Sequence, residues 1–421
     1  MDNTKTNVPE IRFPGFTDPW EQRKFSYVFV GLQNNTLSRA DLNYDQGDKK
    51  KVHYGDVLIK FGEYIDVASA ELPYINDSSI ESKFVKSLLA DGDIIIADTA
   101  EDETVGKCCE ITNSDSMKLL SGLHTIAVRP QQKYASKFLG YYLNSSAYHS
   151  QLIPLMQGIK VTSISKGALQ DTVLTVPTSI DEQGKIGECL SNIDDIITLH
   201  QRKCDELKLY KKGLLQQMFP QPGEAFPRVR FPGFTDPWEQ RKFNEITLPA
   251  GVRNKDNLPL EPYSITNDRG FLPQNEAHDD FGYMQNTDRK AYMVVSPNSF
   301  GYNPARINVG SIGYYEGSEN VIVSSLYEIF KTKDYIDDHF LMHWFKSDLF
   351  PRWIQKFQEG SVRQYFYYDK LCECSLTFPS LAEQRKISTL IDSIDTTITL
   401  HQRKCDELKL YKKGLLQKMF V

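Results

Sequence analysis

The sequence predicts a mixed α+β chain in which two α/β domains are joined by two long antiparallel coiled-coil helices, with an internal pseudo-two-fold repeat. Two exact repeats support this prediction. The segment TLHQRKCDELKLYKKGLLQ at 198–216 returns unchanged at 399–417, and RFPGFTDPWEQRKF at 12–25 returns unchanged at 230–243. The third observation is that the bodies between these repeats, about 26–177 and 244–379, barely resemble each other. We therefore interpret the chain as a constant head, a variable body and a constant helix, used twice.

The two long helices are predicted from apolar residues spaced alternately four and three apart. An average spacing of 3.5 residues over about five heptads is typical of a coiled coil, and a helix of this length measures roughly 55 Å. Each helix is more acidic near its start and more basic near its end, so antiparallel pairing sets basic against acidic residues. The expected seam consists of Ile186, Leu190, Ile193, Ile197, Leu207 and Leu214 in the first helix, and Ile387, Ile391, Ile394, Ile398, Leu408 and Leu415 in the second.

The repeats and turn residues divide the chain into five expected segments. These are a first domain at 1–180, a central helix at 181–219, a linker at 220–230, a second domain at 231–380 and a C-terminal helix at 381–421. The proline-rich stretch 220–227 marks the helix stop. Strands are expected within 54–60, 91–97, 291–295 and 320–324, and packed helices within 138–153 and 336–357.

Composition is that of an ordinary water-exposed globular protein. Hydrophobic residues make up 40% of the chain and charged residues 25%. No apolar run approaches the roughly 18 residues needed to span a bilayer, and the start of the chain lacks the apolar region of a signal peptide. The odd number of cysteines, 7, without a CxxC pair favours reduced thiols in a cytoplasmic protein with no membrane partner. The net charge of −6 argues weakly against a nucleic-acid binder, because one face can be basic while the rest is acidic.

Motifs for catalysis are incomplete. The tripeptide Asp-Pro-Trp at 18–20 and 236–238 lacks the second proline of the amino-methyltransferase motif, and no GxxxxGK[ST] phosphate loop is present. The Glu-x-Lys triplets at 206–208 and 407–409 resemble part of a nuclease site, but they lie on the predicted long helices. We therefore favour a structural tryptophan in each head and solvated flanks on each helix.

A zinc site is the one metal hypothesis. His200 and Cys204, and likewise His401 and Cys405, are four residues apart, which places each pair on one helix face. Two such pairs could form a tetrahedral site. The alternative, which we favour, is that all four residues only pack in the seam.

Polar and basic loops are the candidates for DNA contact. Arg, Lys, Asn and Gln read base edges, whereas Ser, Thr and Lys hold phosphates. A single charged run is more often only a solvated surface, but two loops at equivalent places in the two halves favour binding. The candidates are Lys49, Lys50, Lys51, Lys160, Thr162, Ser163, Lys166, Arg253, Asn254, Lys255, Asn257, Ser361, Arg363, Gln364 and Tyr365.

The whole arrangement resembles the specificity subunit of type I restriction–modification systems. The motifs that carry the resemblance are the two PGFxxxW heads at 14–20 and 232–238, and the Pro-to-Glu-Gln-x-Lys-Ile junctions at 176–186 and 378–387. The loops at 157–161 and 359–363 are also similar, with Val161 standing where the family-like Arg363 stands in the second half. The segment 303–310 resembles a recurring motif of the recognition domains, which adds Arg306 to the candidate contacts.

This resemblance implies two target recognition domains, each reading half of a bipartite site in double-stranded DNA. The helices would set the spacing and dock two methyltransferase subunits. It implies no catalytic residue, metal or cofactor in this chain; S-adenosylmethionine, ATP and Mg would belong to the methyltransferase and restriction subunits. The main alternative is a coiled-coil scaffold that bridges two partner copies without reading DNA; an enzyme with an unrecognised site is another. Divergent bodies favour DNA reading, because a scaffold for identical partners gains nothing from different ends.

Overall fold

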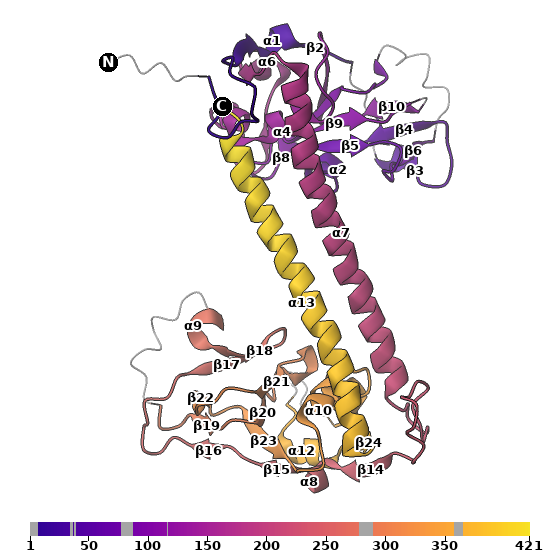
Figure 1. Ribbon diagram of the computed structural model, residues 1–421, viewed down its shortest axis with the longest axis vertical. Helices are drawn as coiled ribbons and strands as arrows, with labels where there is room; N and C mark the ends of the chain where they lie inside the picture. Colours follow the sequence, from indigo (N-terminus) through magenta and orange to yellow (C-terminus); the bar gives the residue numbers. More distant parts are fainter. Residues whose placement is uncertain are drawn as a thin grey trace. The chain divides into compact units, whose positions relative to one another are not determined.

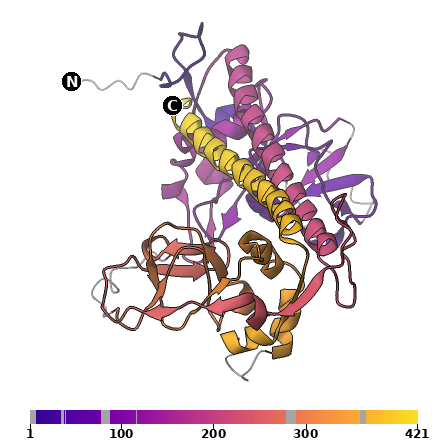
Figure 2. The same cartoon turned by 60° about the horizontal axis from the view of Figure 1, so that its bottom comes forward.

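The computed structural model describes residues 7–33, 37, 39–76, 87–115, 117–277, 289–357 and 365–421. The chain divides into two compact units, one formed by 1–201 with 403–421 and the other by 202–402. Two long helices, α7 (Ile180–Met218) and α13 (Leu381–Lys418), contribute to both units. Each appears as one uninterrupted ribbon in Figure 1 and again in Figure 2. Each unit therefore holds one body, the start of one long helix and the end of the other.

The body of the first unit is built on a five-stranded sheet with the order β2-β11-β7-β9-β5. Its middle strand carries consecutive isoleucines that are buried on both faces, so layers of side chains cover the sheet on both sides. The strands are β2 (Phe29–Gly31), β11 (Thr125–Pro130), β7 (Ile94–Ala97), β9 (Cys108–Thr112) and β5 (Tyr64–Asp66). All neighbours are antiparallel except β5 and β9.

Smaller sheets complete this body. A four-stranded sheet has the order β10-β4-β6-β3, and two strand pairs, β1-β13 and β12-β8, tie the loops together. The bounds are β10 (Lys118–Ser121), β4 (Lys49–Val52), β6 (Tyr74–Ile75), β3 (Leu42–Asn43), β1 (Glu21–Lys24), β13 (Val173–Val176), β12 (Thr162–Ser163) and β8 (Thr99–Ala100). The short helices are α1 (Phe25–Val28), η1 (Arg39–Asp41), α2 (Tyr54–Ile59), α4 (Phe138–Asn144), α5 (Ser146–His149), η4 (Ile153–Leu155) and α6 (Lys166–Gln170).

Two local expectations for this body need correction. The strand expected within 54–60 is wrong, because these residues form helix α2. Its first turn is capped by His53, whose ring accepts a hydrogen bond from the Gly55 N–H, and only Val57 of the helix is buried. The helix expected over 138–153 is divided, since Ser145 adopts an extended conformation between α4 and α5. The strand expected within 91–97 is confirmed by β7.

The body of the second unit contains a four-stranded sheet, β15-β23-β20-β21, and a three-stranded sheet, β16-β19-β22. Strand pairs β17-β18 and β14-β24 complete it. The bounds are β14 (Glu239–Lys242), β15 (Thr247–Pro249), β16 (Val252–Arg253), β17 (Tyr263–Thr266), β18 (Gly270–Pro273), β19 (Met293–Val295), β20 (Ser299–Tyr302), β21 (Ile312–Tyr315), β22 (Val321–Val323), β23 (Glu328–Thr332) and β24 (Ser375–Phe378). Strands β19 and β22 confirm the two strands expected here.

The helices of this body surround an aromatic core. They are α8 (Phe243–Ile246), α9 (Gln274–Ala277), η6 (Ile307–Val309), α10 (Asp338–Phe345), α11 (Phe350–Phe357) and α12 (Tyr368–Glu373). The long helix expected over 336–357 is two helices, α10 and α11. Asp337 caps the first of them by accepting a hydrogen bond from the Phe340 N–H at 2.9 Å. Phe300, Phe330 and Phe345 lie at the centre of the core.

Antiparallel pairing of the long helices is confirmed within each unit. In the first unit, Lys412 binds Asp194 at 2.8 Å, and the Cys405 thiol donates to the Ile197 carbonyl. In the second unit, Lys211 binds Asp395 at 2.6 Å, and the Cys204 thiol donates to the Ile398 carbonyl. In both units the residue numbers rise along α7 while those of its contacts on α13 fall. The basic ends thus face the acidic starts, as the charge gradient predicts.

Burial at the predicted seam positions depends on the neighbouring body. Ile186, Leu190, Ile193, Ile387, Ile391, Ile394 and Leu415 are buried, whereas Ile197, Leu207, Leu214, Ile398 and Leu408 are partly buried. The first turns of α7 join the core of the first body, and the first turns of α13 join that of the second. Among the described helices, none is both long enough and apolar enough to cross a bilayer.

Candidate nucleic-acid interface

The repeated heads fasten each body to a long helix. Arg12 donates two hydrogen bonds, of 2.6 and 2.9 Å, to the buried Glu182 of α7. Arg230 likewise donates two, of 2.7 and 2.8 Å, to Glu383 of α13. These pairs stand at equivalent places in the two repeats. The carboxylate of Glu182 raises the pKa of Arg12 through these hydrogen bonds. The repeated head and the Glu-Gln junction of each half thus form a structural contact, although they are 170 residues apart in the first half and 153 in the second.

The tryptophan of each head packs on the phenylalanine that follows the other long helix of its unit. The Trp20 and Phe420 ring centroids are 6.3 Å apart, and so are those of Trp238 and Phe219. The glutamine of each junction also makes a structural contact. The Gln183 side chain accepts a hydrogen bond from the Ala135 N–H, and the Gln384 side chain accepts one from the Asp337 N–H. Both Asp-Pro-Trp tripeptides therefore have structural roles, as favoured from the sequence.

The lysine run at 49–51 is not the exposed loop that we expected. These residues form strand β4, and strand alternation turns Lys49 and Lys51 inward, where they are 1% and 0% exposed. The Lys51 ammonium donates to the Leu37 carbonyl, and burial lowers its pKa to about 8. We therefore withdraw Lys49 and Lys51 as DNA contacts. Lys50 points to the other face, with its Nζ 5.1 Å from the centre of the Tyr74 ring.

The loop before α6 is a closed turn at the surface of the first unit. Gln157 and Ser163 exchange backbone hydrogen bonds of 2.9 and 2.8 Å, and β12 pairs with β8. Lys160 and Ser163 are exposed, and Thr162 is partly buried. Lys166 is also exposed, at the start of α6. The structure thus brings the four predicted contacts Lys160, Thr162, Ser163 and Lys166 into one short surface segment.

The candidates at 253–257 separate into exposed and structural residues. Arg253 in β16, Lys255 and Asn257 are exposed. Asn254 is 2% exposed, and its amide both donates to and accepts from the backbone of Leu258. Because its polar atoms hold the turn, we withdraw Asn254 as a base contact.

Arg306 and Tyr365 come from distant parts of the sequence and lie on neighbouring segments. The Phe366 N–H donates to the Pro304 carbonyl at 3.0 Å, which fixes the loop of Arg306 beside residues 365–367. Phe366 is buried, whereas the rings of Tyr365 and Tyr367 stack outside it with centroids 5.5 Å apart. Arg306 is exposed. Ser361, Arg363 and Gln364 lie outside the described residues.

In each unit, two segments that follow and precede comparable elements contact each other, but the side chains that they expose differ between the units. In each, the loop that follows a central strand, β7 or β20, contacts the segment that precedes a short helix, α6 or α12. The first loop exposes Glu101, Asp102 and Glu103, where the second exposes Arg306. Carboxylates accept hydrogen bonds from cytosine amino groups, whereas arginine donates to guanine. Sequence reasoning missed the acidic loop and Tyr367, since only the fold places them beside the predicted contacts.

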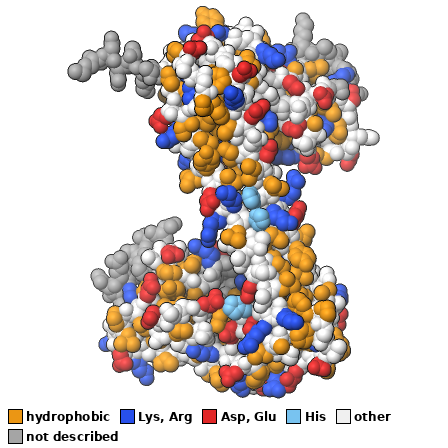
Figure 3. Space-filling view, in the orientation of Figure 1, with side chains coloured by type: hydrophobic (Ala, Val, Ile, Leu, Met, Phe, Trp, Pro, Cys, Tyr) orange, Lys and Arg blue, Asp and Glu red, His pale blue; other side chains and the backbone are white. Residues whose placement is uncertain are grey.

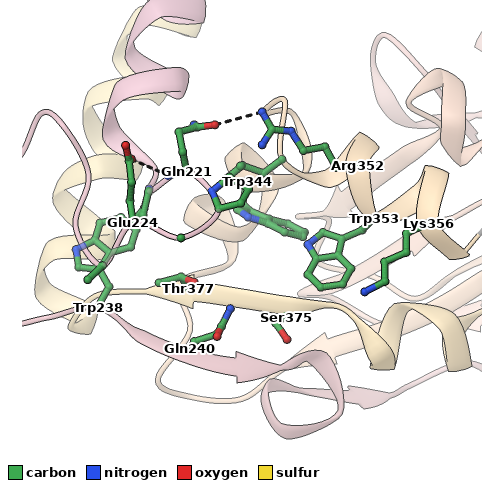
Figure 4. A pocket seen from close by; sticks show the side chains of 15 residues that line it. Gln221, Glu224, Trp238, Gln240, Trp344, Arg352, Trp353, Lys356, Ser375 and Thr377 are labelled. Carbon is green, nitrogen blue, oxygen red and sulfur yellow. Dashed lines mark hydrogen bonds between the residues drawn. The ribbon is translucent and has the colours of Figure 1, made fainter.

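A cleft of about 530 Å³ in the second unit has no catalytic set. It lies between the linker at 220–225, the β14-β24 pair and α11, and Figure 4 shows Trp353 and Lys356 on one wall. Arg352 donates to the Gln221 side chain at 3.3 Å. Glu224 is held by the Gln221 N–H and by Arg228. The residues that line the cleft offer neither a histidine nor a cysteine to act with a nucleophile.

The zinc hypothesis gains no support from the described residues. The thiols of Cys204 and Cys405 donate to backbone carbonyls of the opposite helix. The grouping of His, Cys, Asp and Glu that does approach metal-site spacing is His343, Asp392 and Asp395. There Lys211 already lies 2.6 Å from both oxygens of Asp395, so its ammonium neutralises the carboxylate. Packing in the seam, the favoured alternative, accounts for both thiols.

Comparison with known proteins decides the family. A family model described as "Type I restriction modification DNA specificity domain" matches residues 18–209 and 286–410. The chain belongs to the type I restriction–modification DNA specificity family. It is thus a non-catalytic specificity subunit that serves DNA sequence recognition, as the sequence resemblance implies.

Relatives support this assignment over nearly the whole specificity subunit. The chain is 21% identical to the putative type I restriction enzyme MjaX specificity subunit of Methanocaldococcus jannaschii, covering 98% of this chain and 94% of that one. It is also 21% identical to the MjaVIII specificity subunit of the same organism, over 62% of this chain and 64% of the other.

Solved structures share the fold. The type I S subunit from M. genitalium matches with a TM-score of 0.59 at 13% identity, covering 98% of this chain and 99% of that one. A chain from a structural study of complex assembly and conformational transition of the type I R-M system matches with a TM-score of 0.53 at 15% identity, with the same coverage. On the face drawn in Figure 3, basic and acidic side chains are intermingled.

Proposed function

We propose that each unit reads one half of a bipartite site in double-stranded DNA, and that α7 and α13 set the spacing and dock two methyltransferase subunits. The observation that carries the proposal is the constant helical frame around two different surface loops. The segment at 157–166 in the first unit and Tyr365 in the second each precede a short helix, and residues 101–103 and Arg306 each lie in the loop after a central strand. Different side chains at equivalent places are what two half-sites of different sequence require.

Two repeated apolar surfaces on the helices support docking of two identical partners. In the first unit, Leu199 of α7 is 63% exposed, and Leu410 and Tyr411 of α13 are 72% and 59% exposed. In the second unit, the equivalents Leu400, Leu209 and Tyr210 are 56%, 73% and 57% exposed. Large apolar side chains that stay exposed on a helix favour a protein interface. Because the residues repeat, each unit offers the same exposed side chains, from the middle of one long helix and the C-terminal part of the other.

The reaction chemistry belongs to the partners in this proposal. The methyltransferase subunits supply S-adenosylmethionine and the catalytic residues, and restriction subunits supply the ATP- and Mg-dependent activity. The specificity subunit places these partners on its DNA site in the cytoplasm. A scaffold that does not read DNA is not favoured, because the family is defined by DNA specificity.

Native mass spectrometry of the specificity subunit at saturating methyltransferase tests the docking. We expect two methyltransferase copies. Changing Leu209 and Tyr210 to glutamate should remove one copy, and changing Leu410 and Tyr411 should remove the other. The matched control is Lys409→Glu, an exposed change on α13 that leaves the apolar residues intact. A single copy at saturation would contradict two equivalent surfaces. Methylome sequencing of cells that carry the system tests DNA reading, since a bipartite methylated motif is expected.

A further inference from the structure

The most exposed large apolar side chain among the described residues lies at the tip of a predicted DNA-binding loop. Ile159 is 101% exposed, and Val161, two residues later, is 54% exposed. Lys160 stands between them and is also exposed. Ile159 and Val161 lie together on the same short turn, and the lysine between them suits a polyanion.

The tip is held rigidly, so Ile159 is presented in a defined place. Gln157 and Ser163 close the loop with their two backbone hydrogen bonds, and Gly158 has a φ of +123°. A Cβ at position 158 would collide with the Val161 carbonyl oxygen, so only glycine fits there. The loop is therefore a tight turn closed by a single β-bridge, with Ile159 near its tip.

The base of the loop is anchored in the core of the first unit. Thr162 and Ser163 pair with β8, and the Ile164 N–H donates to the Asp98 carbonyl at 2.9 Å. Ile164 is 3% exposed and Leu169 is fully buried. Anchoring of this kind lowers the ordering cost when the tip contacts a ligand.

We propose that Ile159 reads the C5-methyl group of a thymine in the major groove of the half-site bound by the first unit. The major groove is the wider of the two grooves, and thymine is the base that displays a methyl group there for apolar contact. Lys160 and Lys166 provide the cations, and Thr162 and Ser163 the hydroxyl groups, that suit the flanking phosphates. This inference rests on DNA reading by the first unit and names one determinant of its specificity.

The test removes the methyl group from the DNA and its partner from the protein. Once the methylated motif is known, each thymine of the first half-site is replaced in turn by deoxyuridine, which lacks only the C5-methyl group. Binding is measured with the assembled specificity and methyltransferase subunits at one fixed salt concentration. We expect one replacement to weaken binding of the wild type about three- to ten-fold, the range for losing one buried methyl-sized contact.

Variants at position 159, measured on the same DNAs, complete a double-mutant cycle between protein and DNA. The Ile159→Ala variant should bind the thymine site about ten-fold more weakly than the wild type. Its affinity should no longer change when deoxyuridine replaces that thymine. Ile159→Val should keep most of the sensitivity. Ile59→Ala serves as the matched control, because Ile59 is 88% exposed but lies on α2, and it should leave binding unchanged.

The outcomes separate this inference from the DNA reading on which it rests. If the wild type tolerates deoxyuridine at every thymine while other base changes in the half-site still abolish binding, methyl reading by Ile159 is refuted and DNA reading stands. If no base change in that half-site affects binding, the first unit does not read DNA. Equal sensitivity of wild type and Ile159→Ala to the same deoxyuridine would assign the methyl contact to another residue.

Discussion

The arginine–glutamate pair that joins the second head to α13 gives a sharp test of what stabilises the second unit. Arg230 and Glu383 share two hydrogen bonds of 2.7 and 2.8 Å, and the Glu383 side chain is 1% exposed. Arg230→Met keeps the side-chain bulk and leaves a buried carboxylate without its cation. Removal of one partner of a buried ion pair costs roughly 3–5 kcal/mol. Because the Arg230 side chain is 15% exposed, some water can replace it, and we expect a loss of about 3 kcal/mol in the free energy of unfolding of the second unit.

Tryptophan fluorescence during urea unfolding is the appropriate assay. Trp238, Trp344 and Trp353 lie in the second unit, and Trp20 lies in the first, so the signal reports mainly on the second. Arg230→Lys keeps the positive charge but loses the planar guanidinium that makes both hydrogen bonds. It should lower the free energy of unfolding by about 1–2 kcal/mol. Glu383→Gln combined with Arg230→Met completes a double-mutant cycle whose coupling energy measures the pair itself.

A surface ion pair provides the control. Lys203 and Glu206 are 3.6 Å apart with side chains 50% and 59% exposed, and Lys203→Met should change stability by less than about 0.5 kcal/mol. A loss below about 1 kcal/mol for Arg230→Met, with an unchanged denaturant dependence, would refute the reasoning that the head is fastened through this buried pair.

Four further changes test other parts of the molecule. Burial raises the pKa of Glu110 from 4.5 to about 7, so the folded chain holds a proton that the unfolded chain has lost. The free energy of unfolding should therefore fall as pH rises through this window, and Glu110→Gln should remove that fall in urea titrations at about pH 5 and pH 8. Replacing 244–379 with the body of another family member should change one half of the methylated motif only; a change in both halves would disprove modular reading. Arg363→Ala should cost about 1–3 kcal/mol of binding and relax one base position in a competition assay, whereas a uniform loss over all sequences would indicate a phosphate contact. Inserting Leu-Tyr-Lys-Lys after Lys212 adds roughly 5–6 Å of helix and should lengthen the unread spacer by one or two base pairs, as read by methylome sequencing; an active variant with the original spacing would show that the helices are not the ruler.

The long helices, their antiparallel pairing and the repeated frame could be predicted from the sequence because their signals are local. Heptad spacing puts Ile186, Leu190 and Ile193 on one side of a helix whatever surrounds it. The charge gradient then favours antiparallel pairing of the helices. The structure contains the corresponding ion pairs, Lys211 with Asp395 and Lys412 with Asp194. Exact duplication of the heads made the two-fold organisation visible without any geometry.

The interface depended on tertiary structure, because exposure and proximity are not properties of a short segment. Lys49 and Lys51 look like a basic loop in the sequence, yet strand pairing of β4 turns them inward, where the Leu37 carbonyl offsets part of the desolvation cost of the Lys51 ammonium. Conversely, nothing in the sequence places residues 101–103 beside the loop at 157–163. That proximity arises from the pairing of β8 with β12, whose partners are far apart in the chain. The sequence by itself determined the repeated helical frame, whereas the side chains that this frame presents were decided by long-range strand pairing and by the cost of burying charge.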